Sequence, residues 1–461
     1  MVTEPAETET AARGSRWPKS DGAGHRFFAT AARGTEGALR REIAALRIAG
    51  ARGDNGGVWF EGSLEMGLAV CLHARTAMRV LLEVGRFEVD DGESLYAGAR
   101  TVDWQPWFGA ATTLAVAADV RDAPGLRHSG FAALKVKDAV VDVLRDARGS
   151  RPDVDTRRPD VAIRLHVSGR EAKLFIDLAG EPLHRRGYRV AMTDAPLKET
   201  LAAAVLMLGR VEGDRAMVDP MCGSGTLAIE HALAARRIAP GLRRRFAFQR
   251  WPLFGGEAVR QAWGRMLEAA RAEVLPAAPA PIVCSDRFAD AVEAAQQNAA
   301  AAGVARDIVF SVQDVRELQP PAGAAGNLVM NPPYGERLMG PGGPGGGGDA
   351  GERPHARPGQ RPQRQPGLQR QPGPAVRPYT RGGDGDRRPP RGPLPRDEHI
   401  QQLKLAGLYR GIATTFERFK GWGAVVLSGS PLWTDEIARR PLISHRLYNG
   451  PLEVRLLRYE L

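Results

Sequence analysis

The sequence predicts an α/β protein in which a doubly wound, largely parallel sheet follows a smaller α+β region. Three observations lead to this prediction. From about residue 195 onward, short apolar strands alternate with helices, which is the pattern of a parallel sheet covered on both faces. A glycine-containing loop follows one of these strands. The chain has 461 residues, of which 43% are hydrophobic, and this length exceeds a single core and predicts two or three domains.

The N-terminal half mixes strands and helices. Apolar residues spaced three and four apart predict helices, and alternating apolar and polar residues predict strands. The longest predicted helix covers 64–84 and would present Arg75 and Arg79 one turn apart. The predicted strands are 27–30, 57–60, 161–167 and 172–178, the last two as a hairpin, and the predicted helices are 35–46, 64–84 and 130–145.

The C-terminal half supplies the alternating series. The predicted strands are 216–219, 281–285, 307–312, 327–330 and 423–428, and the predicted helices are 226–235, 290–302, 400–419 and 435–439. A closing hairpin over 447–459 turns at Asn449-Gly450, a residue pair that favours tight hairpin turns.

Two segments have a composition that cannot form a core. Residues 1–24 contain few large apolar residues and are predicted to be disordered. Residues 341–395 are dominated by Gly, Pro, Arg and Gln and are predicted to be a low-complexity insertion. Counted to residue 398, this segment holds 11 arginines and 6 acidic residues, so nearly half of the net charge of +11 lies there. The insertion is either a solvated loop or an arginine-rich tether for RNA, and the sequence leaves both interpretations open.

Charge and composition narrow the classes of partner. The net charge of +11 and the pI near 10.0 favour a polyanion, and RNA, DNA and an anionic membrane surface are all compatible. No apolar run is long enough to span a bilayer, and the polar N-terminus is unlike a signal peptide. We therefore expect a cytoplasmic protein without a membrane partner. The 3 cysteines lie far apart without metal-ligand spacing, so neither a disulfide framework nor a metal site is predicted.

The glycine loop at 219–226 reads Asp-Pro-Met-Cys-Gly-Ser-Gly-Thr. Gly223 and Gly225 let the backbone approach a ligand where a Cβ atom would clash. The loop falls at the end of a strand, where open α/β sheets bind their ligands. It lacks the third glycine of the pyrophosphate fingerprint, so a nucleoside cofactor without pyrophosphate fits best.

Two acidic residues follow the next strands. Asp286 ends the strand after the glycine loop, where its carboxylate would accept hydrogen bonds from both hydroxyls of a ribose or would cap the following helix. Asp314 follows the third strand and would accept the adenine amino group of the cofactor or serve as an ordinary loop or cap acid. For each residue the sequence leaves both roles open.

Asn331-Pro332-Pro333-Tyr334 follows a predicted strand and suits a planar group with an exocyclic amine. The Asn331 side-chain oxygen and the Pro332 carbonyl would accept its two N–H groups and stabilise developing positive charge. The prolines stiffen the loop, and Tyr334 would stack on the flat base. An activated methyl group needs positioning more than acid–base catalysis. The two motifs together therefore predict methylation of a base amino group with S-adenosylmethionine as donor; the alternative for the tetrapeptide is an ordinary turn.

These motifs resemble those of the THUMP-domain class I RNA methyltransferases. The resemblance rests on 219–226, on 331–338 (Asn-Pro-Pro-Tyr-Gly-Glu-Arg-Leu), and on 135–139, 183–189, 195–200 and 448–453. It covers about residues 27–461 apart from the insertion, which is foreign to the family pattern. Within the family the chain is most similar to the bacterial enzymes that form N2-methylguanosine in large-subunit (23S) rRNA, in a form without their second methyltransferase domain.

The resemblance implies domains, a cofactor and site residues. It implies a Rossmann-like methyltransferase domain at 190–461 that uses S-adenosylmethionine, preceded by a ferredoxin-like part at 25–64 and a THUMP RNA-binding domain at 65–180. We expect a monomer. The implied cofactor-binding residues are Asp219, Met221, Gly223, Gly225, Thr226, Asp286, Asp314 and Asn331, and Asn331, Pro332, Pro333 and Tyr334 would hold the target guanine. Lys135, Lys137, Arg185, Arg186 and Arg189 would contact RNA phosphates or would be solvated surface charges.

Four functions remain as hypotheses. The leading one is guanine-N2 methylation of 23S rRNA, and guanine-N2 methylation of tRNA follows closely because THUMP domains also serve tRNA modification. A DNA adenine-N6 methyltransferase and a non-catalytic RNA-binding ribosome assembly factor are weaker alternatives.

Overall fold

The computed structural model describes residues 24–123, 125–126, 128–193, 196–323, 325–334 and 396–461. The predictions of a disordered N-terminus and of a low-complexity insertion at 341–395 lie outside the described residues, as does the motif segment 335–338.

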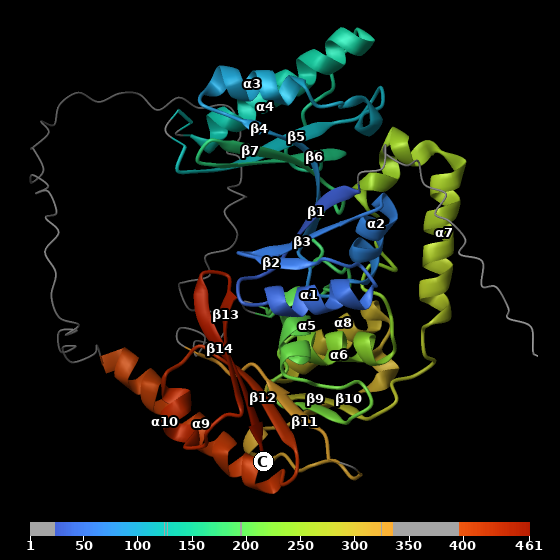
Figure 1. Cartoon of the computed structure of the whole chain (residues 1–461). Coiled ribbons are helices and arrows are strands. Elements are labelled where there is room, and N and C mark those ends of the chain that lie inside the picture. Colours follow the sequence, from blue (N-terminus) through green and yellow to red (C-terminus); the bar gives the residue numbers. More distant parts are fainter. Residues whose placement is uncertain (1–23, 124, 127, 194–195, 324, 335–395) are drawn as a thin grey trace, which may run out of the picture.

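The N-terminal half forms one seven-stranded sheet with the order β2-β3-β1-β4-β7-β6-β5. β4 pairs antiparallel with β1 on one side and with β7 on the other, so it joins the two predicted N-terminal parts. In Figure 1, α3 and α4 cover the outer face of β4–β7. The elements are β1 (His25–Thr30), α1 (Glu36–Ala45), β2 (Arg52–Asp54), β3 (Gly57–Gly62), α2 (Leu64–His73), β4 (Arg79–Glu88), α3 (Gly92–Arg100), β5 (Leu114–Arg121), α4 (Ser129–Arg148), β6 (Val161–Ser168) and β7 (Glu171–Asp177).

The predicted helix at 64–84 is wrong in its second half. α2 ends at His73, Ala74 has extended dihedral angles (φ −70°, ψ 120°) and β4 begins at Arg79. Val80 and Leu82 are buried in the sheet, where β4 exchanges hydrogen bonds with strands on both sides. A short apolar run is compatible with either helix or strand, and here pairing with β1 and β7 decides. Arg75 and Arg79 therefore do not share a helix face.

The C-terminal half forms a second seven-stranded sheet with the order β10-β9-β8-β11-β12-β14-β13. The pairs from β10 to β12 are parallel, and β14 is antiparallel to both β12 and β13. The strands are β8 (Met217–Asp219), β9 (Ile282–Asp286), β10 (Ile308–Val312), β11 (Asn327–Met330), β12 (Gly423–Ser428), β13 (Ile443–Asn449) and β14 (Leu452–Glu460). The prediction of a doubly wound, largely parallel sheet with a closing hairpin is confirmed.

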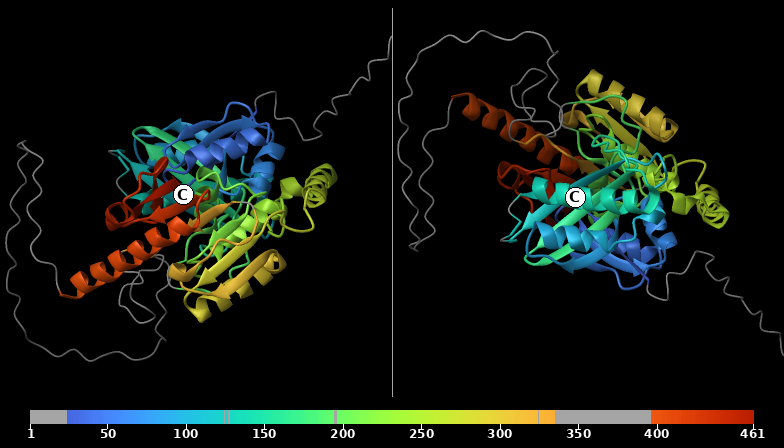
Figure 2. Two further views of the ribbon diagram at one scale, coloured as in Figure 1. Left: turned by 90° about the horizontal axis from the view of Figure 1, so that it is seen from below. Right: turned by 90° about the horizontal axis from the view of Figure 1, so that it is seen from above.

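Helices cover both faces of this second sheet. α5 (Glu199–Leu208), α6 (Thr226–Ala235) and α8 (Ala289–Ala302) share one apolar core. α9 (Arg396–Arg418) and α10 (Leu432–Ile437) share the core on the other face. Figure 2 shows the N-terminal end of α9 extending away from the rest of the protein.

The two halves of the protein pack against each other. α7 (Glu257–Ala272) was not predicted from the sequence. It lies in the C-terminal half of the sequence, but in space it lies beside α2 (Figure 1). Its Val259, Ala262 and Trp263 are buried in the core of the N-terminal half. Conversely, Ala38 of α1 is buried in the core that contains α5. The N-terminal half is therefore held in a defined position against the second sheet.

Candidate functional site at the carboxyl edge of the second sheet

The residues predicted to bind cofactor and substrate gather at one edge of the second sheet. The glycine loop follows β8, Asp286 ends β9, Asp314 follows β10 and Asn331 follows β11. These four strands are neighbours in the order β10-β9-β8-β11 and run parallel. Their carboxyl ends therefore meet at one edge, which is the usual ligand-binding edge of such sheets.

The two glycines of the loop, Gly223 and Gly225, have different structural roles. Both have left-handed backbones, with φ of +51° at Gly223 and +79° at Gly225. A Cβ atom on Gly225 would lie 2.8 Å from the Cβ of Ala295 in α8, so this glycine permits close helix packing. A Cβ atom on Gly223 would meet nothing nearer than the Thr193 hydroxyl at 3.6 Å. Gly223 is thus required for its backbone conformation and leaves its outer surface open.

Asp219 is a buried carboxylate with an incomplete set of partners. It is fully buried, and its Oδ1 accepts only a long hydrogen bond of 3.4 Å from the Met221 backbone N–H. Among the described residues, its Oδ2 has no hydrogen-bond partner. Burial and the nearby Asp286 raise the pKa of Asp219 well above its ordinary value. A buried acid in this state suits a cationic or hydrogen-bond-donating ligand group.

Asp286 fastens the glycine loop to the next helix. Its two oxygens accept the backbone N–H of Gly223 at 3.0 Å and that of Phe288, the N-cap residue of α8, at 3.1 Å. Burial raises the pKa of its carboxyl. This carboxylate therefore supports the start of α8 through the backbone of Phe288, and the ribose-binding role stays a prediction.

Asp314 serves as a helix cap in this structure. It precedes the 3₁₀ helix η5 (Val315–Glu317) and accepts the Arg316 backbone N–H at 2.9 Å. The Arg316 guanidinium also binds both carboxylate oxygens, at 2.9 and 2.7 Å. These contacts with Arg316 lower the pKa of Asp314 to about 2. The predicted contact with adenine stays a prediction.

The Asn331-Pro332-Pro333-Tyr334 loop is held by distant parts of the chain. The Tyr409 hydroxyl in α9 donates to the Pro333 carbonyl at 2.8 Å. Asn449 at the end of β13 donates from Nδ2 to the Tyr334 hydroxyl at 3.0 Å. The Asn331 Oδ1 atom is buried and has no hydrogen-bond partner among the described residues. An acceptor is thus available at the position where the sequence predicted one.

The side chain of Tyr334 lies inside the protein. It is 5% exposed and belongs to the core beneath β12. A Cβ atom on Gly429 would lie 2.6 Å from its ring, so only glycine fits there without displacing the ring. In this arrangement the ring lacks a free face for a base, because packing covers it. The predicted stacking role thus requires the ring to leave its present position and stays a prediction.

Three of the five residues predicted to contact phosphate are partly or largely exposed, and their role in RNA binding stays a prediction. Lys135 and Lys137 lie on α4 and form ion pairs with Glu93 at 2.5 Å and with Asp138 at 2.6 Å. The side chain of Arg185 is 58% exposed. Surface pairs of this kind are weak and exchange readily with phosphate.

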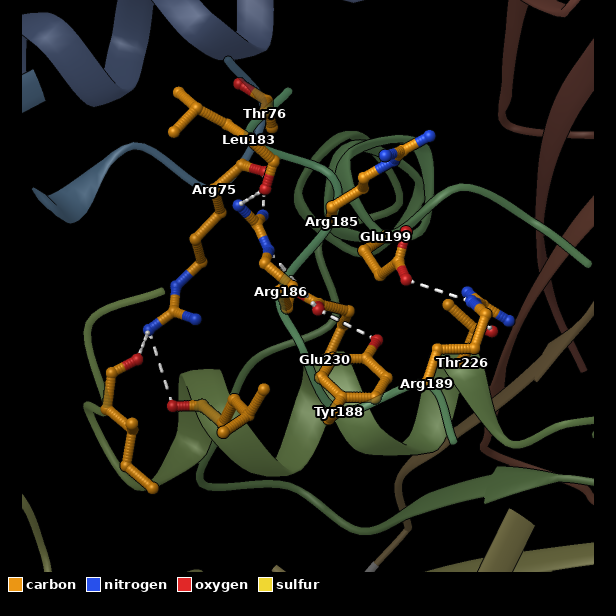
Figure 3. A network of polar contacts seen from close by, with 12 residues as sticks. Arg75, Thr76, Leu183, Arg185, Arg186, Tyr188, Arg189, Glu199, Thr226 and Glu230 are labelled. Atoms are coloured by element: carbon orange, nitrogen blue, oxygen red, sulfur yellow. Dashed lines mark hydrogen bonds and ion pairs between the residues drawn. The ribbon is translucent and has the colours of Figure 1, made fainter. Parts of the chain in front are cut away.

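The other two, Arg186 and Arg189, are structural, which corrects the prediction. The side chain of Arg186 is 3% exposed; it donates to the Leu183 and Arg75 carbonyls and lies 3.6 Å from the Glu230 carboxylate. Arg189 pairs with Glu199 at 3.0 Å and donates to hydroxyls on either side of Gly225. Figure 3 shows both side chains directed into this network while Arg185 points away from it. The Arg186 guanidinium is buried and cannot also reach a phosphate, and the Arg189 guanidinium, whose side chain is 15% exposed, is occupied by internal partners.

Sequence reasoning missed several supporting residues. Asn298 in α8 is fully buried; its side chain donates to the Ser224 carbonyl at 3.0 Å and accepts the backbone N–H groups of Val190 and Ala191. It therefore ties the segment before α5 to the glycine loop. A lone amide on the inner face of an alanine-rich helix is the signal that marks it. Tyr409 carries no local signal, and the sequence marked Asn449 as a turn and motif residue without indicating its contact with Tyr334, because both partners are remote in sequence.

A basic hollow on the N-terminal half was also missed. An open depression of about 530 Å³ at the end of α1 is lined by Arg40, Arg41 and Arg47.

The described part of the chain contains neither a membrane-spanning helix nor a cluster of metal ligands. No helix there is long and apolar enough to cross a bilayer, and no group of three or more His, Cys, Asp or Glu side chains is placed to hold a metal ion.

Family models match three successive parts of the chain. The RlmL ferredoxin-like domain matches residues 26–81, the THUMP domain matches 89–177, and the RMKL-like methyltransferase domain matches 186–342. Most of β4, the strand shared by the two N-terminal parts, lies between the first two ranges. The predicted boundaries at 64 and 180 stay predictions.

Curated relatives share most of this sequence. The ribosomal RNA large subunit methyltransferase K/L of Syntrophotalea carbinolica is 36% identical over 453 residues, which are 95% of this chain and 53% of the relative. The protein of the same name from Magnetococcus marinus is 43% identical over 322 residues, 68% of this chain and 44% of the relative. The chain spans about half the length of the curated relatives it matches.

Solved structures share the whole architecture. SMU.472, provisionally named a methyltransferase and crystallised with SAH, matches with a TM-score of 0.74 and 25% identity over 95% of this chain and 98% of that one. A predicted N6-adenine-specific DNA methylase from Listeria monocytogenes matches with a TM-score of 0.72 and 26% identity over 94% and 96%. The chain thus carries a ferredoxin-like domain, a THUMP domain and an RMKL-like methyltransferase domain, in this order.

Proposed function

We propose that this protein transfers the methyl group of S-adenosylmethionine to the exocyclic N2 amine of a guanine in large-subunit ribosomal RNA. The observation that carries the proposal is the buried Asn331 Oδ1 atom, which lacks a hydrogen-bond donor among the described residues. It stands at the carboxyl edge of the sheet, next to the strand that carries the glycine loop. A buried acceptor without a donor is costly, and an amine donor from the substrate would satisfy it.

The cofactor site would use the loops on four neighbouring strands. S-adenosylmethionine supplies an activated methyl group when bound. The Asp219 Oδ2 atom, buried without a partner among the described residues, fits the cofactor's ammonium group. The residues that would line the site are Asp219, Met221, Gly223, Gly225, Thr226, Asp286, Asp314 and Asn331, with Asp286 at the ribose and Asp314 at the adenine.

Methyl transfer would rely on positioning and on hydrogen-bond acceptors. The amine nitrogen of guanine is a poor nucleophile because its lone pair is delocalised into the ring. Asn331 Oδ1 and the Pro332 carbonyl would accept its N–H groups and stabilise the positive charge that develops as the nitrogen attacks. Pro333 and Tyr334 would hold this loop in place, through Tyr409 and Asn449.

RNA would bind mainly through the N-terminal half. Lys135, Lys137 and Arg185 are reachable, and the hollow lined by Arg40, Arg41 and Arg47 offers further phosphate contacts. A paired target guanine would have to flip out of its helix to reach Asn331. We propose a monomer that acts in the cytoplasm.

The names of the curated relatives support ribosomal RNA over other substrates. A guanine-N2 enzyme for tRNA is the second candidate, since the THUMP domain is compatible with either RNA. A DNA adenine methyltransferase is less favoured because the chain carries a THUMP domain. A non-catalytic assembly factor is disfavoured by the buried acceptors at Asp219 and Asn331, which have no hydrogen-bond partner among the described residues.

Mass-spectrometric nucleoside mapping of rRNA and tRNA from a deletion strain tests the proposal. We expect one N2-methylguanosine to disappear from large-subunit rRNA and to return when the gene is restored. Unchanged rRNA together with a missing methyl group in tRNA would favour the second candidate. Methylation of DNA oligonucleotides would revive the DNA hypothesis, and failure to bind S-adenosylmethionine would favour the assembly factor.

A further inference from the structure

We propose that Asn449 is a positioning residue for the methyl-transfer loop, and that the N-terminal half holds it in place through Arg33 and Tyr448. This inference rests on the proposed function of the Asn331-Pro332-Pro333-Tyr334 loop. It extends the contact between Asn449 and Tyr334 to the rest of the Tyr-Asn-Gly-Pro-Leu-Glu segment at 448–453 and to its neighbours in the N-terminal half.

The first link joins the hairpin to the loop. Asn449 ends β13 and donates from Nδ2 to the Tyr334 hydroxyl at 3.0 Å, a contact between residues 115 apart in sequence. Gly429 packs against the Tyr334 ring, since a Cβ atom at this position would lie 2.6 Å from the ring. The Tyr334 side chain is therefore fixed between the start of the loop after β12 and the tip of the β13–β14 hairpin.

The second link joins the hairpin to the N-terminal half. The Arg33 guanidinium lies over the Tyr448 ring, 4.6 Å from its centre. Next to it, Gly34 has φ of +88°, and a Cβ atom there would lie 2.3 Å from the Arg446 carbonyl oxygen. Arg33 and Gly34 precede α1, so the segment that begins this helix packs directly against β13. The contact is close enough to exclude any other side chain at position 34.

A second Asn-Gly turn in the chain offers a comparison for Asn449. The turn between β2 and β3 uses the same residue pair, Asn55-Gly56, also with a left-handed glycine. Asn55 makes a local hydrogen bond, from its backbone N–H to the Asp54 carboxylate at 2.7 Å. The two asparagines thus share their place in a hairpin, and they differ in that the Asn449 side chain reaches the catalytic loop. This makes Asn55 a matched control.

The consequence is a mechanical connection between RNA binding and chemistry. The N-terminal half, which would bind RNA, contacts the hairpin tip, and the hairpin tip holds Tyr334. A shift of the N-terminal half would therefore change the position of Tyr334 and of the acceptors beside it. Misplacement of a catalytic loop by about 1 Å lowers turnover by as much as about 100-fold.

The first experiment compares Asn449→Leu with Asn55→Leu in full-length protein. We expect Asn449→Leu to lower kcat about tenfold, the effect of one lost hydrogen bond of ordinary strength, with KM for S-adenosylmethionine unchanged. Asn449→Asp should recover much of kcat, because the Tyr334 hydroxyl can then donate to the carboxylate. Asn55→Leu should behave as wild type. Equal effects of the two leucine variants, or no effect of either, would overturn the proposal.

The second experiment needs no RNA and so separates this inference from the proposed function. Fluorotyrosine incorporated at position 334 gives a ¹⁹F NMR signal that reports the surroundings of the ring. We expect Asn449→Leu and Arg33→Ala to move this signal. Arg26→Ala, which removes another arginine lying over an aromatic ring in the same half, 5.4 Å from the centre of Trp59, should leave it in place.

A signal that stays unchanged in Arg33→Ala would show that the N-terminal half does not reach Tyr334, and the inference would fail. A moved signal in a protein that methylates no ribosomal RNA would instead sink the proposed function and keep the connection.

Discussion

At the scale of single residues, the site is marked by two buried oxygen atoms that lack a partner among the described residues. Asp219 Oδ2 and Asn331 Oδ1 lie at the ends of the neighbouring strands β8 and β11. Proteins rarely bury such atoms, because each costs about 1–3 kcal/mol. Their presence at the ligand-binding edge indicates groups kept ready for a ligand.

Replacing Asn331 by alanine tests the acceptor. We expect Asn331→Ala to lower kcat by about 100-fold or more, the effect of removing one preorganised hydrogen-bonding group. Affinity for S-adenosylmethionine should change little, as measured by isothermal titration calorimetry. Asn55→Ala, at an exposed turn, is the control. Near-normal turnover in Asn331→Ala would exclude the role proposed for the amide oxygen.

We expect Asp219 to lower the stability of the folded protein and to strengthen cofactor binding. Its pKa is raised in the folded protein, so the folded state holds the proton more tightly than the unfolded chain, and stability falls as pH rises above the ordinary value of 3.8. We expect Asp219→Asn to stabilise the protein by about 1–3 kcal/mol at pH 7 and to weaken cofactor binding. Urea unfolding at several pH values measures the first effect.

The gain from Asp219→Asn should shrink as pH falls below 3.8, the ordinary pKa of the group, because the wild-type carboxyl is then protonated in the unfolded chain as well. A gain that does not vary with pH, or a loss of stability at pH 7, would contradict this account of Asp219.

At the scale of elements, the Asn331-Pro332-Pro333-Tyr334 loop depends on what packs around it. The loop follows β11. Contacts to it come from α9, from Gly429 directly after β12, and from β13. The loop is short, and its geometry comes from these neighbours as much as from its two prolines.

Gly429 offers a test of this packing. We expect Gly429→Ala to displace the Tyr334 ring and to lower stability by about 1–3 kcal/mol, as overpacking does, with a fall in kcat. Gly407→Ala in α9 is the matched control, because a Cβ atom there meets nothing within 4 Å; the better helix propensity of alanine should stabilise it by up to about 1 kcal/mol. Unfolding and initial-rate measurements compare the two, and equal stabilities would contradict the predicted clash.

The elements themselves were largely predictable. The helices α4 and α8 follow from apolar periodicity, since each buries one face, whereas β8, β11 and α6 are buried nearly throughout and follow from short apolar runs. The prediction of a helix at 64–84 failed where Val80 and Leu82 pair within a sheet. α7 was missed because the partner of its apolar face, the N-terminal core, is far away in sequence.

At the scale of the whole molecule, two adjacent arginines have opposite roles. Arg186 is buried between the halves and donates to the Arg75 carbonyl, a contact between residues 111 apart in sequence. Arg75 in turn donates to the Leu233 and Ile238 carbonyls of the second half. Arg185 points outward (Figure 3). Buried charged side chains thus form part of the interface between the halves. Removing one partner of a buried ion pair strongly destabilises a protein.

Substituting each arginine by methionine separates the roles. We expect Arg186→Met to lower the free energy of unfolding by about 3–5 kcal/mol, because Glu230 loses its cation inside the protein. Arg185→Met should change stability by less than about 0.5 kcal/mol but weaken RNA binding and reduce the dependence of affinity on salt by about one phosphate contact. Urea titrations and filter binding at several salt concentrations measure both; the reverse pattern would restore Arg186 as an RNA contact.

The sequence by itself determined the class of the protein and the edge of the sheet that carries the site. These follow from local features: apolar periodicity, glycines that permit a left-handed backbone, and polar residues at the ends of strands. The tertiary structure alone decided which charges are buried and what holds the catalytic loop. Whether Arg186 faces solvent or Glu230, and whether Asn449 merely turns a hairpin or also holds Tyr334, depends on contacts between residues far apart in the chain, which local sequence does not encode.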